Sequence, residues 1–489
     1  WDGFIPGHDG IIVGIPILRQ FLENHGDWSR GLFSASWKGG VKLFQLAGLQ
    51  PAPQFFAWMN LPITAIANLN VWIIQVLAST LSIFSARNLV TLITRYQEFN
   101  FDWLTKIFAI LITGFAPVLA WRIFMGHEII ANGAIAFLAG LTLLTAAMIQ
   151  SFSPSQVLVS TLAFTTALQG GGPQTLVYSL IFGLPIFLGV FSIRPKLSSH
   201  FHWVYLIPLA AILLSAPKLF AIIENVRSSD AARTIGGESV TYSYITATLE
   251  DWWTSIFWSI ASVVGVRSPQ YYHEINYPFG PLLLMLFAIP FRTMKWRLIG
   301  SLTSGSLAIL FSMNISPFSD FLLMFPTISS FRVPERSIFS FSLFLPVFAL
   351  VVFSRFTTLS KSNNLSPTSF SSILISIVVF LFSFFLPSTG REVIAWLSVI
   401  LILAEHKQIL SLTKSIQVSV LAMVAAASLG AFLERAPGKF RSYNEITKPT
   451  QDLGAFVLQQ APSLAVPLNR ITMTAQANDF YTNTAKVAG

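Results

Sequence analysis

The chain has 489 residues, of which 53% are hydrophobic and 10% are charged, and its mean hydropathy is +0.65. Soluble domains carry about 25% charged residues, so this composition excludes an ordinary soluble protein and indicates one that lies in a bilayer. The absence of cysteine excludes disulfides and cysteine-based metal sites, and basic cytoplasmic loops explain the net charge of +9 better than nucleic acid does, since no basic run with interleaved aromatic residues occurs.

Residues 1–60 are predicted to form the first outer loop. The chain opens at Trp1 with a polar, Gly-rich stretch, and we expect a further N-terminal membrane helix to precede it. Residues 11–22 are apolar enough to lie as an amphipathic helix on the membrane surface. The first region is therefore expected to rest against the outer face of the membrane.

Residues 61–433 are predicted to form a bundle of transmembrane helices. A spanning helix needs about 20 mostly apolar residues, and about twelve such segments recur here, some of them short enough to require tilt or local thinning of the bilayer. The predicted spans are 62–84, 103–123, 131–149, 154–168, 174–193, 202–223, 279–292, 298–314, 337–354, 371–386, 393–404 and 411–433. The fold class expected is an all-α polytopic membrane protein.

Lysine and arginine residues predict the orientation of these helices, because basic residues collect in cytoplasmic loops. The basic residues of one alternating set of short loops are Arg87, Arg95, Arg194, Lys196, Arg292, Lys295, Arg297, Arg355, Lys361 and Lys407. That assignment places the large loop 224–278 and the segment 434–489 on the outer side, together with residues 1–60. The polar segment 434–489 reads as the start of a small soluble extension.

Asp9 is the first residue that could carry chemistry. It lies in the sequence Gly-His-Asp-Gly at 7–10, just outside the predicted membrane. A carboxylate there could act as a general base that takes a proton from an acceptor hydroxyl. The same four residues are also good turn formers, so a structural turn is the alternative.

Arg332 and Arg336 are the strongest candidates for binding an anion. They belong to the sequence Phe-Arg-Val-Pro-Glu-Arg at 331–336, at the outer end of a predicted span. Arginines at this depth are costly unless they are paired or bind an anion, and the guanidinium group matches phosphate oxygens. Ion pairs with Glu335 are the alternative. Arg227, at the entry to the large outer loop, could likewise hold phosphate or pair with Glu224.

Two outer segments hold further polar candidates. The loop 169–174 contains three glycines followed by proline and Gln174, which suits close approach of backbone to a ligand or tight closure of a helical hairpin. His273 and Glu274, after Tyr272, could be ligands or acid–base groups, although interfacial hydrogen bonding is favoured. No recognised metal-binding spacing and no serine hydrolase elbow occurs, so neither a metal nor any other cofactor is predicted.

Taken in order, these segments resemble a known family. The resemblance rests on the outer Asp9 loop, the Gly-rich loop with Pro-Gln, residues 211–233, the sequence Tyr-Pro-Phe-Gly-Pro-Leu at 277–282 and the segment 325–336, and it spans nearly the whole chain. The chain is similar to the YfhO-like bacterial membrane proteins of the GT-C glycosyltransferase superfamily. It departs from the family pattern at Gly172, where the family has histidine.

The resemblance implies an activity and a set of roles. A GT-C enzyme takes its sugar from a polyprenyl-phosphate carrier and transfers it to an envelope acceptor, a glycan or a lipid, on the outer face of the bacterial inner membrane. Asp9 would be the catalytic base. Arg332, Arg336 and Arg227 would face the lipid phosphate. The residues expected to line the cavity are His8, Gln174, Tyr272, His273 and Glu274.

Two other functions stay open from the sequence. A noncatalytic subunit of an envelope complex would tolerate loss of Asp9 and would carry protein partners on its outer loops. A lipid or glycan transporter would show pseudo-symmetric halves with broken helices, and the sequence gives no sign of such symmetry.

Overall fold

The computed structural model describes helices and two short strands between residues 4 and 442. The described residues are 4–6, 22, 51–93, 103–116, 128–150, 153–170, 206–220, 249–266, 280–285, 312–313, 315, 317, 320–321, 324, 347, 349–351, 370–406, 409, 412–435 and 440–442. The elements are β1 (Phe4–Pro6), α3 (Pro51–Trp58), α4 (Ile63–Ile93), α5 (Trp103–Gly114), α7 (Glu128–Gln150), α8 (Pro154–Gly170), the unlabelled helix Leu206–Phe220, α11 (Leu249–Ile256), α12 (Ile260–Val263), α14 (Gly280–Met285), α20 (Phe370–Phe385), α21 (Ser388–His406), α22 (Lys414–Arg435) and β2 (Phe440–Ser442).

Helix α4 is the longest element and the clearest membrane span. Its stretch Ile63–Thr91 covers 29 residues with a mean hydropathy of 1.6, and within the described ranges it is the helix that is both long and apolar enough to cross a bilayer. At a rise of about 1.5 Å per residue it exceeds the ~30 Å hydrocarbon core, so it must tilt or extend beyond it. Shorter apolar helices lie at Trp103–Gly114, Ala131–Ala146, Leu206–Phe220, Leu374–Phe385 and Ser415–Ala431.

Local sequence signals set several helix ends. Pro154 occupies the first turn of α8, and the flanking Ser153 and Gln156 form a reciprocal capping box with N···O distances of 3.1 and 3.3 Å. Helix α3 ends at Trp58 and is capped by Asn60, whose φ of 56° is left-handed, while the N–H of Leu61 donates to the carbonyl of Phe56 at 3.2 Å. These caps satisfy backbone groups that the helix ends would otherwise leave unpaired.

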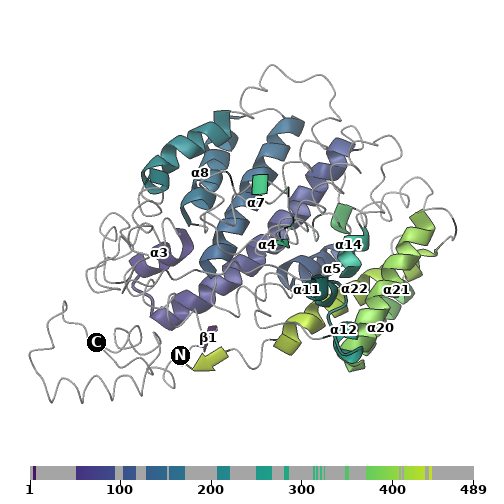
Figure 1. Ribbon diagram of the computed structural model, residues 1–489. Coiled ribbons are helices and arrows are strands. Elements are labelled where there is room, and N and C mark those ends of the chain that lie inside the picture. The colour runs from purple at the N-terminus through teal and green to yellow at the C-terminus, as the bar shows by residue number, and fades with distance from the viewer. Residues whose placement is uncertain are drawn as a thin grey trace, which may run out of the picture.

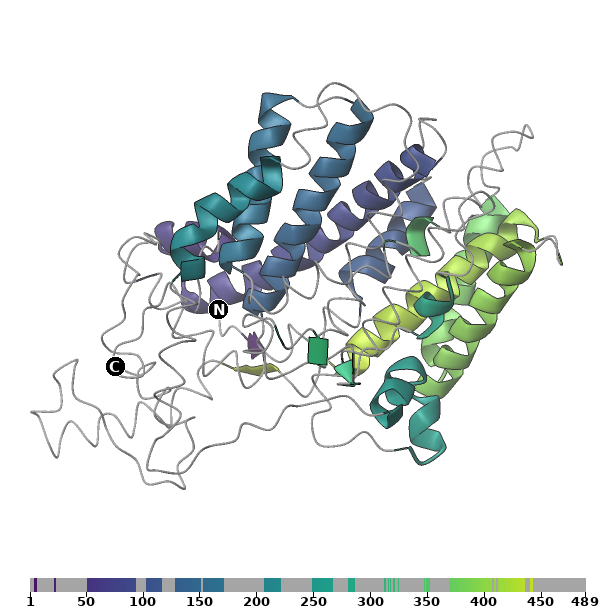
Figure 2. The same cartoon turned by 45° about the horizontal axis from the view of Figure 1, so that its top comes forward.

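The helices form two groups that meet at α5 (Figures 1 and 2). The first group contains α4, α7 and α8, with α5 packed on α4. The second contains α20, α21 and α22, and α11, α12 and α14 lie against it. Helix α5 also contacts α22, and the rings of Phe108 and Phe380 lie 6.0 Å apart across the junction. The bundle is therefore continuous from the N-terminal to the C-terminal helices.

Large apolar side chains cover the outside of the bundle. On α20, Val378, Leu381 and Phe382 are 55, 54 and 62% exposed, and Trp72 on α4 is 62% exposed. Contiguous apolar surface on this scale marks contact with a membrane or a partner, and here it belongs to helices that the composition already assigns to the bilayer. The chain is a helical membrane protein.

The observed helices match most of the predicted spans that fall on described residues. The helical class is confirmed, with one correction: β1 and β2 form a short antiparallel pair that the all-α prediction omitted. Helix α21 begins at Ser388, before the predicted start at 393, and α4 continues to Ile93, beyond the predicted end at 84. The total of twelve spans stays a prediction, because the predicted span 174–193 and all but residues 312 and 313 of the predicted span 298–314 lie outside the described residues. The three-part division of the chain, at residues 60 and 433, likewise stays a prediction.

Candidate functional site

The predicted site residues lie outside the part of the chain that the structure describes. This holds for the predicted base, the three arginines and the residues expected to line the cavity: His8, Asp9, Gln174, Arg227, Tyr272, His273, Glu274, Arg332 and Arg336. The roles of these residues therefore stay predictions. The structure instead defines the elements that flank them.

Among the described elements, β1 of the β1–β2 pair is the one nearest to Asp9 in the sequence. Strand β1 ends at Pro6, and it pairs antiparallel with β2 so that Phe4 lies opposite Ser442 and Pro6 opposite Phe440. Strand β2 follows the C-terminal end of α22, and β1 also contacts α4. Figure 1 shows the pair below the N-terminal end of α4. The first predicted outer region and the C-terminal region are thus joined at one end of the bundle, as the predicted orientation requires.

Lys218 connects the helix Leu206–Phe220 to the end of α8. Its side chain is 1% exposed, and its ammonium group donates to the carbonyl of Gln169, in the last turn of α8. The side-chain amide of Gln169 donates in return to the carbonyl of Leu214 at 3.2 Å. A cation is favourable at the negative end of a helix dipole. Lys218 therefore fixes the residue from which the predicted Gly-rich loop departs.

Glu392 organises a second polar cluster, at the N-terminal end of α21. Its side chain is fully buried, and its Oε2 accepts backbone N–H bonds from Ser259 at 2.6 Å and Ile260 at 2.9 Å. The hydroxyl of Ser259 lies 3.0 Å from those of both Ser388 and Thr389. Because the carboxylate satisfies two N–H groups at the start of α12, it holds the α11–α12 segment on α21.

Aromatic stacking and close backbone packing complete this contact. The ring of Phe257 lies 4.6 Å from that of Trp253 and is stacked at 4.8 Å on Trp396 of α21. A Cβ added at Gly280, the first residue of α14, would collide with the carbonyl of Ile256 and the ring of Trp396. Glycine at position 280 thus allows α14 to approach both α11 and α21 closely.

The environment of Glu392 shifts its acidity. Burial raises the pKa of Glu392, and the backbone N–H groups of Ile260 and Ser259, together with the nearby indole of Trp396, act in the opposite direction. By hydrogen-bond geometry, neither Glu392 Oε1 nor Trp396 Nε1 has a partner among the described residues. One carboxylate oxygen thus holds α12, and the other is buried near the indole of Trp396.

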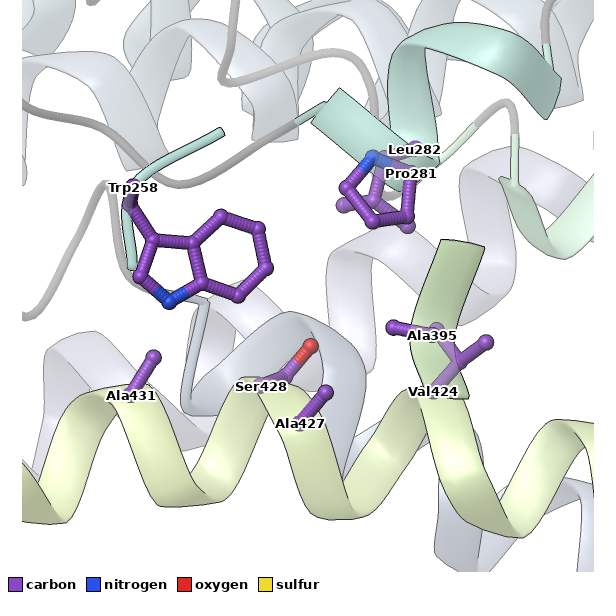
Figure 3. A pocket seen from close by; sticks show the side chains of 8 residues that line it. All are labelled: Trp258, Pro281, Leu282, Ala395, Val424, Ala427, Ser428 and Ala431. Carbon is purple, nitrogen blue, oxygen red and sulfur yellow. The ribbon is translucent and has the colours of Figure 1, made fainter. Parts of the chain in front are cut away.

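A small cavity lies next to this cluster, between α14 and α22 (Figure 3). Its lining is apolar except for the Ser428 hydroxyl and the indole nitrogen of Trp258. The centre of a water molecule could occupy a volume of about 10 Å³ inside it. That volume suits about one water and excludes a sugar or a lipid phosphate. Within the described ranges, no group of three or more His, Asp or Glu side chains could hold a metal ion. Within the described residues, the Glu392 cluster therefore holds α12 on α21, and the cavity beside it is too small for a sugar or a lipid phosphate.

Sequence reasoning missed Lys218, Glu392 and Ser259. Lys218 had a signal, since a single lysine inside the predicted span 202–223 requires a buried partner. Glu392 had a weaker one, as a lone acid directly before the predicted span 393–404. Its partner Ser259 lies 133 residues away, and no local pattern connects the two.

Comparison with known proteins finds similarity to two solved structures of ArnT. No protein-family model matches the chain, and no curated protein matches it. ArnT from Cupriavidus metallidurans in the apo state is 13% identical, with a TM-score of 0.46 over 99% of this chain and 80% of that one. The same ArnT bound to undecaprenyl phosphate is 14% identical, with a TM-score of 0.45 over 98% and 81% of the two chains. The function proposed for this chain rests on its own residues.

Proposed function

We propose that this chain is a membrane glycosyltransferase that moves a sugar from a polyprenyl-phosphate-linked donor to an envelope acceptor, on the outer face of a bacterial inner membrane. The observation that carries the proposal is the β1–β2 pairing. It ties the segment that ends at Pro6, three residues before Asp9, to the strand that follows α22. A predicted base three residues after this pair would lie at the end of the bundle where the arginines are also predicted.

The reaction would proceed as a displacement at the anomeric carbon of the sugar. The acceptor hydroxyl forms the new C–O bond while Asp9 takes its proton, and the bond from the anomeric carbon to the carrier phosphate breaks with its electron pair on the phosphate oxygen. Arg332, Arg336 and Arg227 would stabilise the negative charge that develops on that phosphate. Lys218 would contribute indirectly, by holding Gln169 and hence the start of the loop that carries Gln174.

The first experiment measures transfer of labelled sugar by the purified protein in lipid nanodiscs. The donors are sugars on undecaprenyl phosphate, the lipid bound in one of the two ArnT structures, and the acceptors are envelope lipids. We expect activity in the parent and a loss of at least about a hundredfold in Asp9→Asn, the scale of a general base. Asp27→Asn, in the same predicted outer loop, is the matched control and should retain activity.

The outcomes separate the reaction class from the residue roles. Equal activity in Asp9→Asn and the parent would remove Asp9 from the role of base and leave glycosyl transfer standing. No transfer from any donor by folded protein would overturn the enzyme proposal and favour a noncatalytic subunit. Movement of the labelled lipid across the bilayer without transfer would instead indicate a transporter.

A second experiment tests the arginines through donor binding alone. Arg332→Gln and Arg336→Gln should each weaken binding of undecaprenyl phosphate by roughly 10- to 100-fold, since a charge-assisted hydrogen bond contributes about 1.5–3 kcal/mol. Arg297→Gln, in a predicted cytoplasmic loop, should bind as the parent does. Unchanged binding in both outer variants would show that these arginines pair with Glu335 rather than with phosphate.

A further inference from the structure

The α11–α12 segment has an apolar outer face although it lies within a predicted outer loop. Four of its large apolar side chains are exposed: Leu249, Trp253, Val263 and Val264, at 74, 46, 74 and 66%. A loop in water would present polar side chains at such positions. We refer to these four residues as the α11–α12 apolar face.

The opposite face of the same segment is firmly docked on the bundle. Asp251, Trp252 and Thr254 are each no more than 5% exposed, and the Trp252 indole donates to the hydroxyl of Ser312 at 2.9 Å. Glu392 holds the start of α12 through two N–H groups, as described above. The apolar face therefore belongs to an element whose position is fixed.

The end of α12 keeps the two valines at the tip of a tight turn. Gly265 has a φ of +80°, and the N–H of Val266 donates to the carbonyl of Ala261 at 3.0 Å. This is the pattern of a Schellman cap, which needs a left-handed residue immediately after the helix. The chain reverses directly after Val263 and Val264, so both side chains project from the turn.

We propose that the α11–α12 apolar face inserts into the interface of the outer leaflet and anchors the large outer loop to lipid. The segment that carries the face is bonded to the start of α21, close in the chain to the exposed end of α20. Phe385, at the end of α20, is 86% exposed and lies three residues before Ser388, whose hydroxyl bonds to that of Ser259. Trp253 adds an aromatic side chain of the kind that concentrates at membrane interfaces. The proposal goes beyond glycosyl transfer and does not depend on it.

Depth-dependent fluorescence quenching tests this insertion directly. The chain contains no cysteine, so Val264→Cys carries a single thiol for an environment-sensitive fluorophore. The full-length variant is placed in nanodiscs of phosphatidylethanolamine and phosphatidylglycerol that contain lipids with a nitroxide at either of two acyl-chain depths. Glu250→Cys, an exposed acidic position on α11, is the matched control. Leu381→Cys, exposed on α20, is the reference for contact with lipid.

The expected result is a blue-shifted label at position 264 that the lipid nitroxides quench and aqueous iodide does not. The two nitroxide depths should place it about 5–10 Å below the headgroup boundary, the depth of an interfacial apolar face. The label at position 250 should show the reverse. Quenching at position 264 by iodide to the level at position 250 would overturn the proposal. Protection from both quenchers would also overturn the proposal, because another protein surface would then cover position 264. If that protection remained in discs that hold one chain, the covering surface would belong to the same chain rather than to a second copy.

Discussion

The α4–α7 pair and the α20–α21–α22 group show two different ways to pack helices in a bilayer. Between α4 and α7, the hydroxyls of Ser85 and Thr142 lie 2.5 Å apart, Asn88 donates to the carbonyl of Thr142 at 3.0 Å, and Asn132 donates to Asn70 at 3.2 Å. These polar contacts are distributed along the helices. They join residues 54 to 62 positions apart in the chain, so they also fix the register of the pair.

The C-terminal group relies on small residues along its helices instead. On α22, the buried residues include Ala422, Ala425, Ala426 and Ala427, and at Gly430 the side chain of Arg391 occupies the space that a Cβ would need. Much of the polar contact of this group gathers at the predicted outer end, around Glu392. Lipid tails provide no hydrophobic drive between helices, so both close approach and hydrogen bonding are means of association. The comparison shows hydrogen bonds distributed along the α4–α7 pair, whereas α22 packs through small residues and the hydrogen bonds around Glu392 lie at one end of its group.

Loss of the Glu392 carboxylate should give the largest effect. Glu392→Leu leaves two N–H groups at the start of α12 without their acceptor, at about 1–3 kcal/mol each, so we expect a local destabilisation of about 2–6 kcal/mol. Hydrogen exchange in nanodiscs measures it, as faster exchange of the Ser259 and Ile260 amides. Glu392→Gln, which keeps one acceptor oxygen, should lose much less. Unchanged exchange in the leucine variant would show that α12 is held by its aromatic and apolar contacts alone.

A methyl group at Gly280 should have the next largest effect. Gly280→Ala forces α14 away from Ile256 and Trp396, and overpacking of this kind costs about 1–3 kcal/mol. The measurement is the free energy of unfolding in mixed micelles of a denaturing detergent. Gly390→Ala is the control, because its added Cβ meets neighbours only at ordinary distances of 3.4–3.6 Å. Equal stability of the two variants would mean that the packing of α14 on α21 adapts at little cost.

The smallest effect should come from the polar contacts of the N-terminal pair. A double-mutant cycle with Ser85→Ala and Thr142→Val isolates the contact between their hydroxyls, and we expect a coupling of about 0.6 kcal/mol, with about 1.7 kcal/mol as the upper range for membrane helices. The same unfolding titration measures it. A coupling of 3 kcal/mol or more, well above the range of about 0.5–1.5 kcal/mol for an ordinary hydrogen bond, would reverse the order and make the polar contacts the stronger of the two means of packing.

Hydropathy predicted the helices well where a long apolar run stands between polar segments. The predicted span 131–149 corresponds to α7, and 154–168 to α8, whose start is marked by Ser153, Pro154 and Gln156. The starts of shorter spans were less accurate. Helix α21 includes Ser388, Arg391 and Glu392, which hydropathy alone assigned to a loop because they are polar. These residues face helices and segments that pack on α21, so their polarity serves contacts rather than water.

The sequence by itself determined the helical membrane class, the positions of the main helices and the choice of Asp9 and the arginines as candidates for chemistry. Composition and apolar runs suffice for the first two, because a bilayer accepts only segments that satisfy their own backbone hydrogen bonds. The tertiary structure decided which distant residues meet: β1 with β2, Lys218 with Gln169, and Glu392 with the start of α12. Those contacts depend on how whole helices pack. The local sequence around a polar residue therefore does not predict which distant residue becomes its partner.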